Sequence, residues 1–356
     1  MHIPDGYLSP STCVTLYAAS AAFWYTALRR VKTALSTRTI PLISVFAAFS
    51  FVVMMFNVPL PGGTTGHALG VTTAAIVLGP WGSILALSMA LAIQALLFGD
   101  GGITTLGANC FNMAILGSFV AYGVYRLVAA GADVSGRRRV LAAAIAGYTS
   151  INVCALITAV EFGIQPALFH DGSGTPLYAP YPLRVAIPAM MIGHLTFAGL
   201  AEAAISAGMV SYLQRADIGL LRGSLISRGR LAKADYANAS PRRLWWAVGF
   251  LLLLTPLGVL ATGTAWGEWS ASELQNSRPQ IAAASRHQEP PSAVPAGLGK
   301  LASLWTAPFP GYAPDFIKNP VLGYLLSGMF AVGLLVMMSL IGSAVGRKWR
   351  SPEAST

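Results

Sequence analysis

The chain has 356 residues, and only 10% of them are Asp, Glu, Lys or Arg, compared with about 25% in soluble proteins. With a mean hydropathy of +0.61, this composition excludes a soluble globular protein and predicts a membrane protein. The net charge of +10 does not indicate a nucleic-acid partner, because the basic residues fall in short loops between apolar segments.

Apolar segments recur along the whole chain, and most are long enough to cross a hydrocarbon layer of ~30 Å as a helix. They predict an all-α polytopic membrane protein with nine spans, at residues 11–28, 40–57, 68–79, 80–98, 104–126, 140–162, 183–213, 244–262 and 321–343. The third and fourth spans divide one apolar stretch that Gly79, Pro80 and Gly82 interrupt. Short, broken spans are tolerated only where protein or a water-filled cavity satisfies the freed backbone groups, so this region is predicted to be interior.

The distribution of Lys and Arg predicts the orientation of the chain. Threading nine spans with the N-terminus outside places 18 of the 23 basic residues on the inner side, as the positive-inside bias requires. The C-terminus is then cytoplasmic. Merging the third and fourth spans would invert every later loop, so the charge pattern supports both.

Loop lengths divide the chain into two membrane units. Residues 1–213 form a seven-helix bundle with short loops, and the basic segment 214–243 is predicted to be a cytoplasmic linker. Residues 244–343 form a two-helix C-terminal hairpin around a long outer loop, and residues 344–356 are a cytoplasmic tail. Within the outer loop, the stretch 277–295 is rich in Ser, Ala, Pro and Gln and is predicted to be mobile.

The first residues of the chain predict a metal chelate. The first 28 residues contain no Lys or Arg, so they lack the basic region of a secretory signal peptide, and Met1 is expected to remain as the N-terminus at the outer face. With His2 following, the Met1 amine, the His2 amide nitrogen and the His2 Nδ1 can bind one ion in unstrained chelate rings. Square-planar nitrogen sites favour Ni(II) or Cu(II) over Mg, Ca or Mn.

A second imidazole could complete the plane. His67 closes the loop 60–67, which the charge pattern places on the same outer side as Met1, and three glycines in that loop permit close backbone approach. From the residues alone, a plainer alternative stays open. In that alternative His2 is an ordinary polar residue near the terminus and His67 forms a local hydrogen bond.

Two polar residues are candidates for supporting the ligands. Asp100 lies in an outer loop with Asn109 nearby, and either could orient a ligating imidazole. A turn-forming role is the simpler alternative for Asp100.

Other ionisable residues lie in or near the spans, where their burial is costly. His194 and Glu202 are eight residues apart on one face of a predicted helix, where they form a structural polar pair or, less simply, contact the metal. Glu161, His170 and Asp171 border an outer loop, where they either attract cations or are solvated. None of the five is predicted to be a direct ligand.

Several motifs resemble the substrate-capture (M) subunit of nickel and cobalt energy-coupling-factor transporters, the CbiM and NikM family. They are Met-His-Ile-Pro-Asp-Gly at residues 1–6, Gly-Gly-Thr-Thr-Gly-His at 62–67 and Phe-Gly-Asp-Gly-Gly-Ile-Thr-Thr-Leu-Gly-Ala-Asn at 98–109. The similarity covers essentially residues 1–213. Residues 263–269 and 310–314 resemble the small N component, so the chain resembles a fused M–N protein with a C-terminal PDGLE domain.

The resemblance implies a metal site made by the Met1 amine, the backbone nitrogen and side chain of His2, and His67. Pro4 and Asp5 resemble the nickel branch of the family, whereas Met and Glu at these positions are more often linked to cobalt. The implied cargo is therefore Ni(II), with Co(II) as the close alternative and no resident cofactor.

The resemblance also implies partners and a location. The partners are a transmembrane coupling subunit (the Q or T component) and cytoplasmic ATPase subunits (the O or A component), in the plasma (inner) membrane of a bacterium. The C-terminal hairpin is expected to hold or open the loops over the site.

Missing motifs argue against enzyme activity in this chain. No GxxxxGK[ST] phosphate loop and no HExxH zinc-protease motif occurs, so ATP hydrolysis is expected in separate subunits. A proton-coupled carrier or channel using Asp100, His194 and Glu202 as a relay remains a rival function, and a membrane enzyme is a more distant one.

Overall fold

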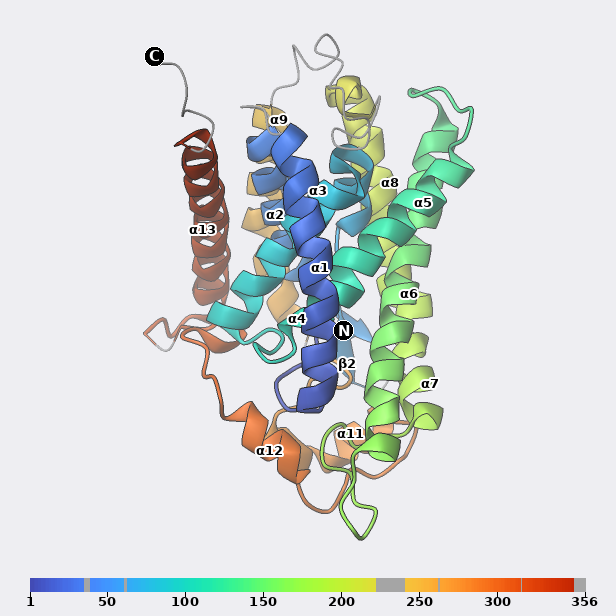
Figure 1. Ribbon diagram of the computed structural model, residues 1–356, viewed down its shortest axis with the longest axis vertical. Helices are drawn as coiled ribbons and strands as arrows, with labels where there is room; N and C mark the ends of the chain where they lie inside the picture. The colour runs from blue at the N-terminus through green and yellow to red at the C-terminus, as the bar shows by residue number, and fades with distance from the viewer. Residues whose placement is uncertain (35–38, 61–62, 222–240, 262, 315, 349–356) are drawn as a thin grey trace, which may run out of the picture.

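Long helices aligned with the long axis form the body of the molecule (Figure 1). The structure is a computed structural model that describes residues 1–34, 39–60, 63–221, 241–261, 263–314 and 316–348. The helices of the N-terminal unit are α1 (Pro10–Ala34), α2 (Thr39–Met54), α3 (Val71–Ile93), α4 (Leu106–Asn109), α5 (Gly117–Val128), α6 (Arg137–Leu168), α7 (Leu183–Gly193) and α8 (Gly199–Ala216). Those of the C-terminal unit are α9 (Pro241–Leu254), α10 (Ala271–Asn276), α11 (Arg278–Ala284), α12 (Ala296–Ala302) and α13 (Pro320–Lys348).

Short turns of other helical types extend several of these helices. Three have the wider π geometry, which often occurs at functional sites. They are Gln94–Phe98 after α3, Cys110–Leu116 between α4 and α5, and His194–Ala198 between α7 and α8. Tighter 3-10 turns span Ile218–Leu221, Thr255–Leu260 and Pro310–Tyr312.

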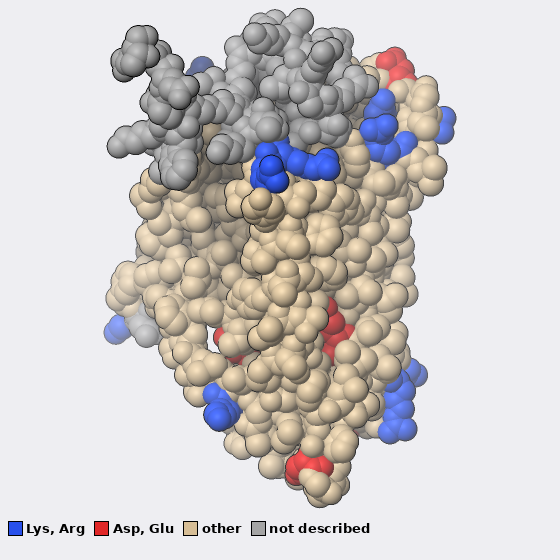
Figure 2. Space-filling model, in the orientation of Figure 1, with Lys and Arg blue, Asp and Glu red and all other residues tan. Residues whose placement is uncertain are grey.

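The apolar helices agree with the predicted membrane fold. Within the described residues, six helical segments are long and apolar enough to cross a membrane: Val71–Phe98, Leu106–Val128, Arg137–Leu168, Leu183–Ala216, Arg242–Leu260 and Pro320–Gly342. The 25-residue α1 and the shorter apolar segment Ile40–Met54 lie among them. Figure 2 shows Lys and Arg in both halves of the molecule, with the larger group near the upper end and a broad belt of uncharged residues below it.

The segment Val71–Phe98 contains the predicted interruption. Gly79 has φ 76° and ψ 167°, which is outside the helical region, and Pro80 follows it without an amide hydrogen. Trp81 lies beneath the guanidinium of Arg30 near the end of α1, whereas the carbonyl of Leu97 accepts a hydrogen bond from the Phe309 amide in the opposite loop region. The break at Gly79 therefore lies where the sequence predicted it, but Val71–Phe98 is one of the six long apolar segments rather than two, and the count of nine crossings stays a prediction.

One short sheet was not predicted. Strand β1 (Val58–Leu60) pairs antiparallel with β2 (Thr64–Gly66), with Val58 opposite Gly66. This hairpin leads directly to His67. The Gly63 carbonyl lies so close to Gly263 that a Cβ on Gly263 would be 2.3 Å from it, so the two units touch at this hairpin.

The outer loop of the C-terminal unit is folded, which corrects the prediction of a mobile stretch at 277–295. Helix α11 occupies part of it, and the guanidinium of Arg278 donates hydrogen bonds to the carbonyls of Pro290 and Pro291 at 2.9 and 2.7 Å. The indole Nε1 of Trp266 also donates to the Ser285 hydroxyl. Most of the predicted linker, residues 222–240, and the tail residues 349–356 lie outside the described residues.

Candidate metal centre

The first six residues lie folded against the loop that joins α3 to α4. The amide of Ile3 donates to Oδ1 of Asn109 at 2.8 Å, and the carbonyl of Ile3 accepts from the Gly102 amide at 2.9 Å. Asp5 accepts the backbone amides of Ile103 and Thr104 at 3.1 and 2.7 Å. These bonds fix the backbone on the C-terminal side of His2, so the first two residues are held in one position.

Close packing at this loop requires glycine. A Cβ on Gly102 would lie 2.4 Å from the backbone nitrogen of Asp5, and Gly101 has a φ of +85°, which side chains disfavour. The Gly-Gly pair therefore allows the N-terminal segment to lie directly on the loop backbone.

The structure brings together all three predicted ligand residues. Nε2 of His67 lies 3.2 Å from Nδ1 of His2, and the two ring centroids are 4.9 Å apart. Met1, His2 and His67 are each at most 5% exposed. The other ring nitrogen of His67 contacts the Ala68 carbonyl at 3.0 Å, which favours the tautomer that leaves the Nε2 lone pair directed at His2.

Two carboxylates complete the cluster. Oδ1 of Asp100 lies 2.9 Å from Nδ1 of His2, and Oε1 of Glu268 accepts a hydrogen bond from the Met1 amine at 2.7 Å. Ligand atoms of His2, Asp100 and Glu268 lie within 4.8 Å of one another. The sequence placed Glu268 in a C-terminal motif but gave no reason to expect it at the N-terminus.

Asp100 is itself held by the C-terminal unit. The hydroxyl of Tyr312 donates to Oδ2 of Asp100 at 2.5 Å, and the amide of Gln94 approaches the same oxygen at 3.3 Å. Although burial would raise the pKa of Asp100, the charge and hydrogen bond of His2 lower it well below the usual range. Burial, reinforced by the Asp100 charge, raises the pKa of Tyr312, so the phenol remains a donor.

The imidazole of His67 is neutral at physiological pH. Burial, with the nearby charges of His2 and the terminal amine, lowers its pKa from 6.5 to about 3. A neutral imidazole is the form that ligates metals. His67 therefore presents a lone pair without first having to lose a proton.

Asn109 has a different role from the one considered from sequence. Its side chain bonds both backbone groups of Ile3, with Nδ2 donating to the carbonyl at 3.1 Å, and among the described contacts it touches no imidazole nitrogen. It therefore positions the segment that carries the predicted ligands Met1 and His2. Of the two predicted supporting residues, only Asp100 contacts a histidine ring.

His194 and Glu202 do not form the polar pair expected from their spacing. Nδ1 of His194 contacts the Met190 carbonyl at 2.8 Å, while the Glu202 carboxylate accepts the backbone amides of Leu69 and Gly70 at 2.7 and 2.9 Å. A π turn begins at His194 and alters the helical phase between the two residues. Glu202 thus stabilises the turn that follows His67.

The outer-loop acids and His170 lie apart from the cluster. Glu161 is buried and accepts a hydrogen bond from Nδ2 of Asn112 at 2.7 Å, which corrects the alternative of a solvated loop charge. Asp171 accepts the amides of Ser173 and Thr175 in its own loop, next to His170. Neither acid contacts His2 or His67 in the described structure.

Comparison with known proteins identifies relatives of both parts of the chain. The family model "Cobalt uptake substrate-specific transmembrane region" (CbiM) matches residues 2–219, and the PDGLE domain model matches residues 242–347. The fused nickel transport protein NikMN of Rhodobacter capsulatus is 51% identical, over 94% of this chain and 95% of its own length.

A more distant relative and a solved structure are also described as metal transporters. The cobalt transport protein CbiM of Geobacter sulfurreducens is 32% identical over 76% of this chain and 74% of its own. A crystal structure described as a truncated transition metal transporter is 52% identical with a TM-score of 0.57, and the match covers 60% of this chain and 99% of that one.

Proposed function

The chain belongs to the CbiM family of cobalt uptake transmembrane proteins, and on this premise we propose that it captures Ni(II) as the substrate-specific component of an energy-coupling-factor transporter. Its C-terminal part is a PDGLE domain. It is a nickel or cobalt transport component, and its relatives are metal transport proteins rather than enzymes.

The observation that carries the proposal is the 3.2 Å contact between the His2 and His67 nitrogens. Metal bonds to imidazole are about 2.0 Å long, so two nitrogens at adjacent corners of a square lie roughly 2.8 Å apart. Nδ1 of His2 lies 2.9 Å from Oδ1 of Asp100 and 3.2 Å from Nε2 of His67, so the two imidazole nitrogens already approach the separation that two ligands of one ion require.

Two further nitrogens complete the proposed plane. The Met1 amine and the His2 amide form chelate rings with the His2 imidazole, and the amine is already oriented by Glu268. An amine that ligates a metal keeps two N–H bonds, so Glu268 can still accept one of them. Four nitrogens in a plane favour Ni(II) over oxygen-preferring cations.

Co(II) is the alternative cargo. The 51% identical relative is described as a nickel protein and the 32% identical relative as a cobalt protein, and the donor set suits both ions. Asp5 favours nickel by resemblance, and its carboxylate, which accepts two loop amides, fixes the N-terminal segment.

A carboxylate-rich site is less consistent with the contacts. His2, Asp100 and Glu268 form a group that offers one imidazole and two carboxylates to a metal ion. However, Glu268 is paired with the Met1 amine and Asp100 with Tyr312. The carboxylates therefore serve better to orient nitrogen donors and to balance the cation charge. This is the usual task of groups that bond to metal ligands.

The proton-relay rival finds no continuous path. Asp100 contacts His2 and Tyr312, whereas Glu202 is bonded to the backbone amides of Leu69 and Gly70. No described contact joins Asp100, His194 and Glu202 into one chain. Uptake by this chain is accordingly proposed to depend on ATP-driven partners.

The proposed transport cycle assigns binding to this chain and energy supply to others. The outer side of the loop borders a cavity of about 210 Å³, lined in part by Pro4, Gly101 and Glu268, which offers a route to the site. A transmembrane coupling subunit and ATPase subunits would reorient the bundle and distort the plane. We place the N-terminus outside and the C-terminus in the cytoplasm, following the charge pattern.

The test is nickel binding by the purified full chain, measured by titration and by absorption spectroscopy. We expect one Ni(II) per chain with the spectrum of a diamagnetic square-planar nitrogen complex. His67→Ala should weaken binding at least tenfold, while the matched control His170→Ala, in an exposed loop, should bind normally. An octahedral, oxygen-rich spectrum would refute the proposed ligand set.

A further inference from the structure

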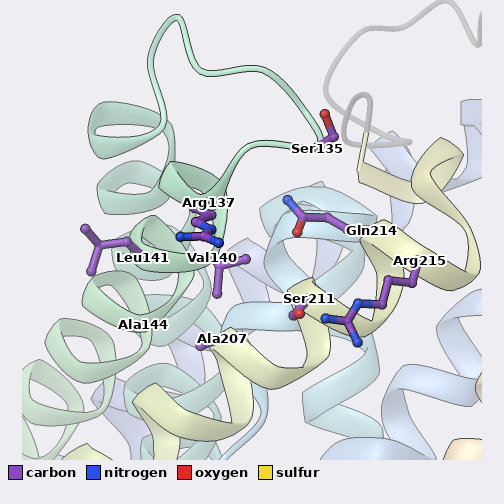
Figure 3. Close-up of a pocket in the computed structure, with 9 residues that line it drawn as sticks. All are labelled: Ser135, Arg137, Val140, Leu141, Ala144, Ala207, Ser211, Gln214 and Arg215. Atoms are coloured by element: carbon purple, nitrogen blue, oxygen red, sulfur yellow. The ribbon is translucent and has the colours of Figure 1, made fainter.

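A second hollow lies at the other end of the molecule, between α6 and α8. It has a volume of about 670 Å³ and is bordered by the beginning of α6 and the end of α8 (Figure 3). Arg137 and Arg215 face it from the two helices, one from each side. None of the proposed metal ligands contributes to it.

The lining changes from polar to apolar along the two helices. On α6, Arg137 is followed at helical spacing by Leu141 and Ala144. On α8, Arg215 is preceded by Ser211 and Ala207 at the same spacing. The charged groups lie at the helix ends and the small apolar groups lie toward the middle, which is the gradient that a lipid headgroup and its acyl chain require.

Arg137 and Arg215 differ from the neighbouring arginines. Arg138 donates to the Val128 carbonyl at 2.8 Å, and Arg139 donates to the Ala132 carbonyl at 3.1 Å, so both fix the preceding loop. Arg215 and Arg137 have no hydrogen bond or ion pair within the described part of the chain. Two uncompensated guanidinium groups facing one hollow attract an anion, and guanidinium suits the oxygens of a phosphate.

Among the residues that the structure describes, no acidic side chain lines the hollow. A phosphate diester would therefore find two cations, but an attached ammonium group would find no counter-ion. Leu141 is 57% exposed beside the hollow, which offers an apolar surface to an acyl chain. The side chain of Gln214 donates to the Val134 and Gly136 carbonyls and holds the loop above the hollow in place.

We propose that this hollow binds an anionic glycerophospholipid, with its phosphate between Arg137 and Arg215 and one acyl chain along Leu141, Ala144 and Ala207. Basic pockets between transmembrane helices on the cytoplasmic side suit such headgroups. The chemistry predicts preference for a headgroup without a positive charge. This site is separate from nickel capture, so it can fail while the metal site stands.

The experiment counts lipids bound to the purified full chain by native mass spectrometry. The protein is released from nanodiscs that contain phosphatidylglycerol and phosphatidylethanolamine in equal amounts. We expect retained phosphatidylglycerol to be favoured roughly tenfold, and Arg137→Gln with Arg215→Gln to abolish that preference. Arg29→Gln with Arg126→Gln is the matched control, because these arginines lie over Tyr25 and Tyr122, outside the hollow.

A second variant separates lipid from free phosphate. Ala207→Phe fills the apolar part of the hollow and should reduce phosphatidylglycerol retention while inorganic phosphate fails to displace the lipid from the wild type. Nickel binding should be unchanged in all variants, which shows that they fold. Equal retention of both lipids by the wild type would overturn the proposal.

Two other results would also overturn it. One is an equal loss of preference in the control pair, which would indicate general surface electrostatics. The other is normal lipid preference in the Arg137 and Arg215 variant combined with loss of co-purifying coupling subunit, which would make the hollow a protein contact.

Discussion

The amine of Met1 lies 2.7 Å from Oε1 of Glu268, so the first residue of the chain is paired with a carboxylate of the C-terminal unit. In the relatives described as fused proteins, both units likewise lie in one chain. This contact gives the C-terminal unit a direct position at the proposed metal site. Loss of that unit would leave the Met1 amine, a proposed ligand, without this partner.

Removing the Glu268 carboxylate tests that role. Glu268→Ala leaves the Met1 amine without its acceptor, and we expect nickel affinity to fall about 10- to 100-fold with an unchanged square-planar spectrum, as for other residues that orient ligands. Glu268→Gln keeps an acceptor oxygen and should lose less. The measurement is isothermal titration with Ni(II), and Glu289→Ala, in the same outer region, is the control. A changed spectrum would mean instead that Glu268 ligates the metal.

Tyr312 is expected to act on the site through Asp100. Tyr312→Phe removes the hydrogen bond to Oδ2 but preserves the ring, which stacks on Phe98 at 4.7 Å between centroids. We expect nickel affinity to fall by a factor of up to about ten, with little change in thermal stability. Tyr178→Phe, outside this cluster, should have no effect on affinity. A large loss of stability without loss of affinity would contradict the assigned role.

The glycine loop provides a test that leaves every ligand in place. A Cβ on Gly102 would clash with the Asp5 backbone, so Gly102→Ala should displace the N-terminal segment and weaken nickel binding at least tenfold. Gly123→Ala is the matched control, because nothing lies within 4 Å of a Cβ there and alanine favours a helix. Both variants should insert in the membrane normally. Equal binding by the two would show that the loop does not position the ligands.

The low pKa of His67 predicts how stability without metal depends on pH. Because the pKa is about 3 in the folded chain and about 6.5 when unfolded, the unfolded chain binds more protons between these values. The contribution of neutral His67 is complete above pH ~6.5 and is lost as the pH falls toward ~3. Thermal unfolding midpoints of wild type and His67→Gln should therefore converge on acidification. Parallel curves would contradict a buried neutral imidazole.

Nickel binding itself should weaken in acid for a different reason. Ligation requires the amine, the amide and both imidazoles without their ligating protons, so binding releases protons and affinity falls as the pH falls. Titrations in buffers of different ionisation enthalpy would measure that release. Affinity independent of pH would exclude an amide nitrogen from the ligand set.

The sequence predicted the parts of the fold that follow local rules. Apolar length gave the helices, and Gly79 with Pro80 marked a break because glycine permits a φ of 76° and proline lacks an amide hydrogen. The orientation rule put the loop of His67 on the same side as Met1, which led to the two-histidine hypothesis. The structure now places those rings in contact.

The remaining contacts of the site could not be read from local patterns. Glu268 contacts Met1 although the two residues are 267 positions apart in the sequence, and Tyr312 contacts Asp100 across 212 positions. Hydrophobic periodicity does not predict contacts between residues so far apart. The polar composition of residues 277–295 suggested mobile chain, but backbone carbonyls of prolines there bind Arg278. His194 and Glu202 were misjudged because a π turn changed their helical phase.

The most direct test of the proposed capture mechanism adds five residues before Met1 and measures nickel binding by the purified full chain, with the N-terminus verified by intact mass. A single added residue would place the histidine third, where an amine, two amides and an imidazole can still chelate nickel, whereas five residues move the free amine out of reach of the His2 nitrogens. The account predicts loss of the square-planar spectrum and at least a hundredfold weaker binding, with normal insertion and with normal binding in a variant extended after Thr356. Wild-type affinity and spectrum in the N-terminally extended chain would contradict it.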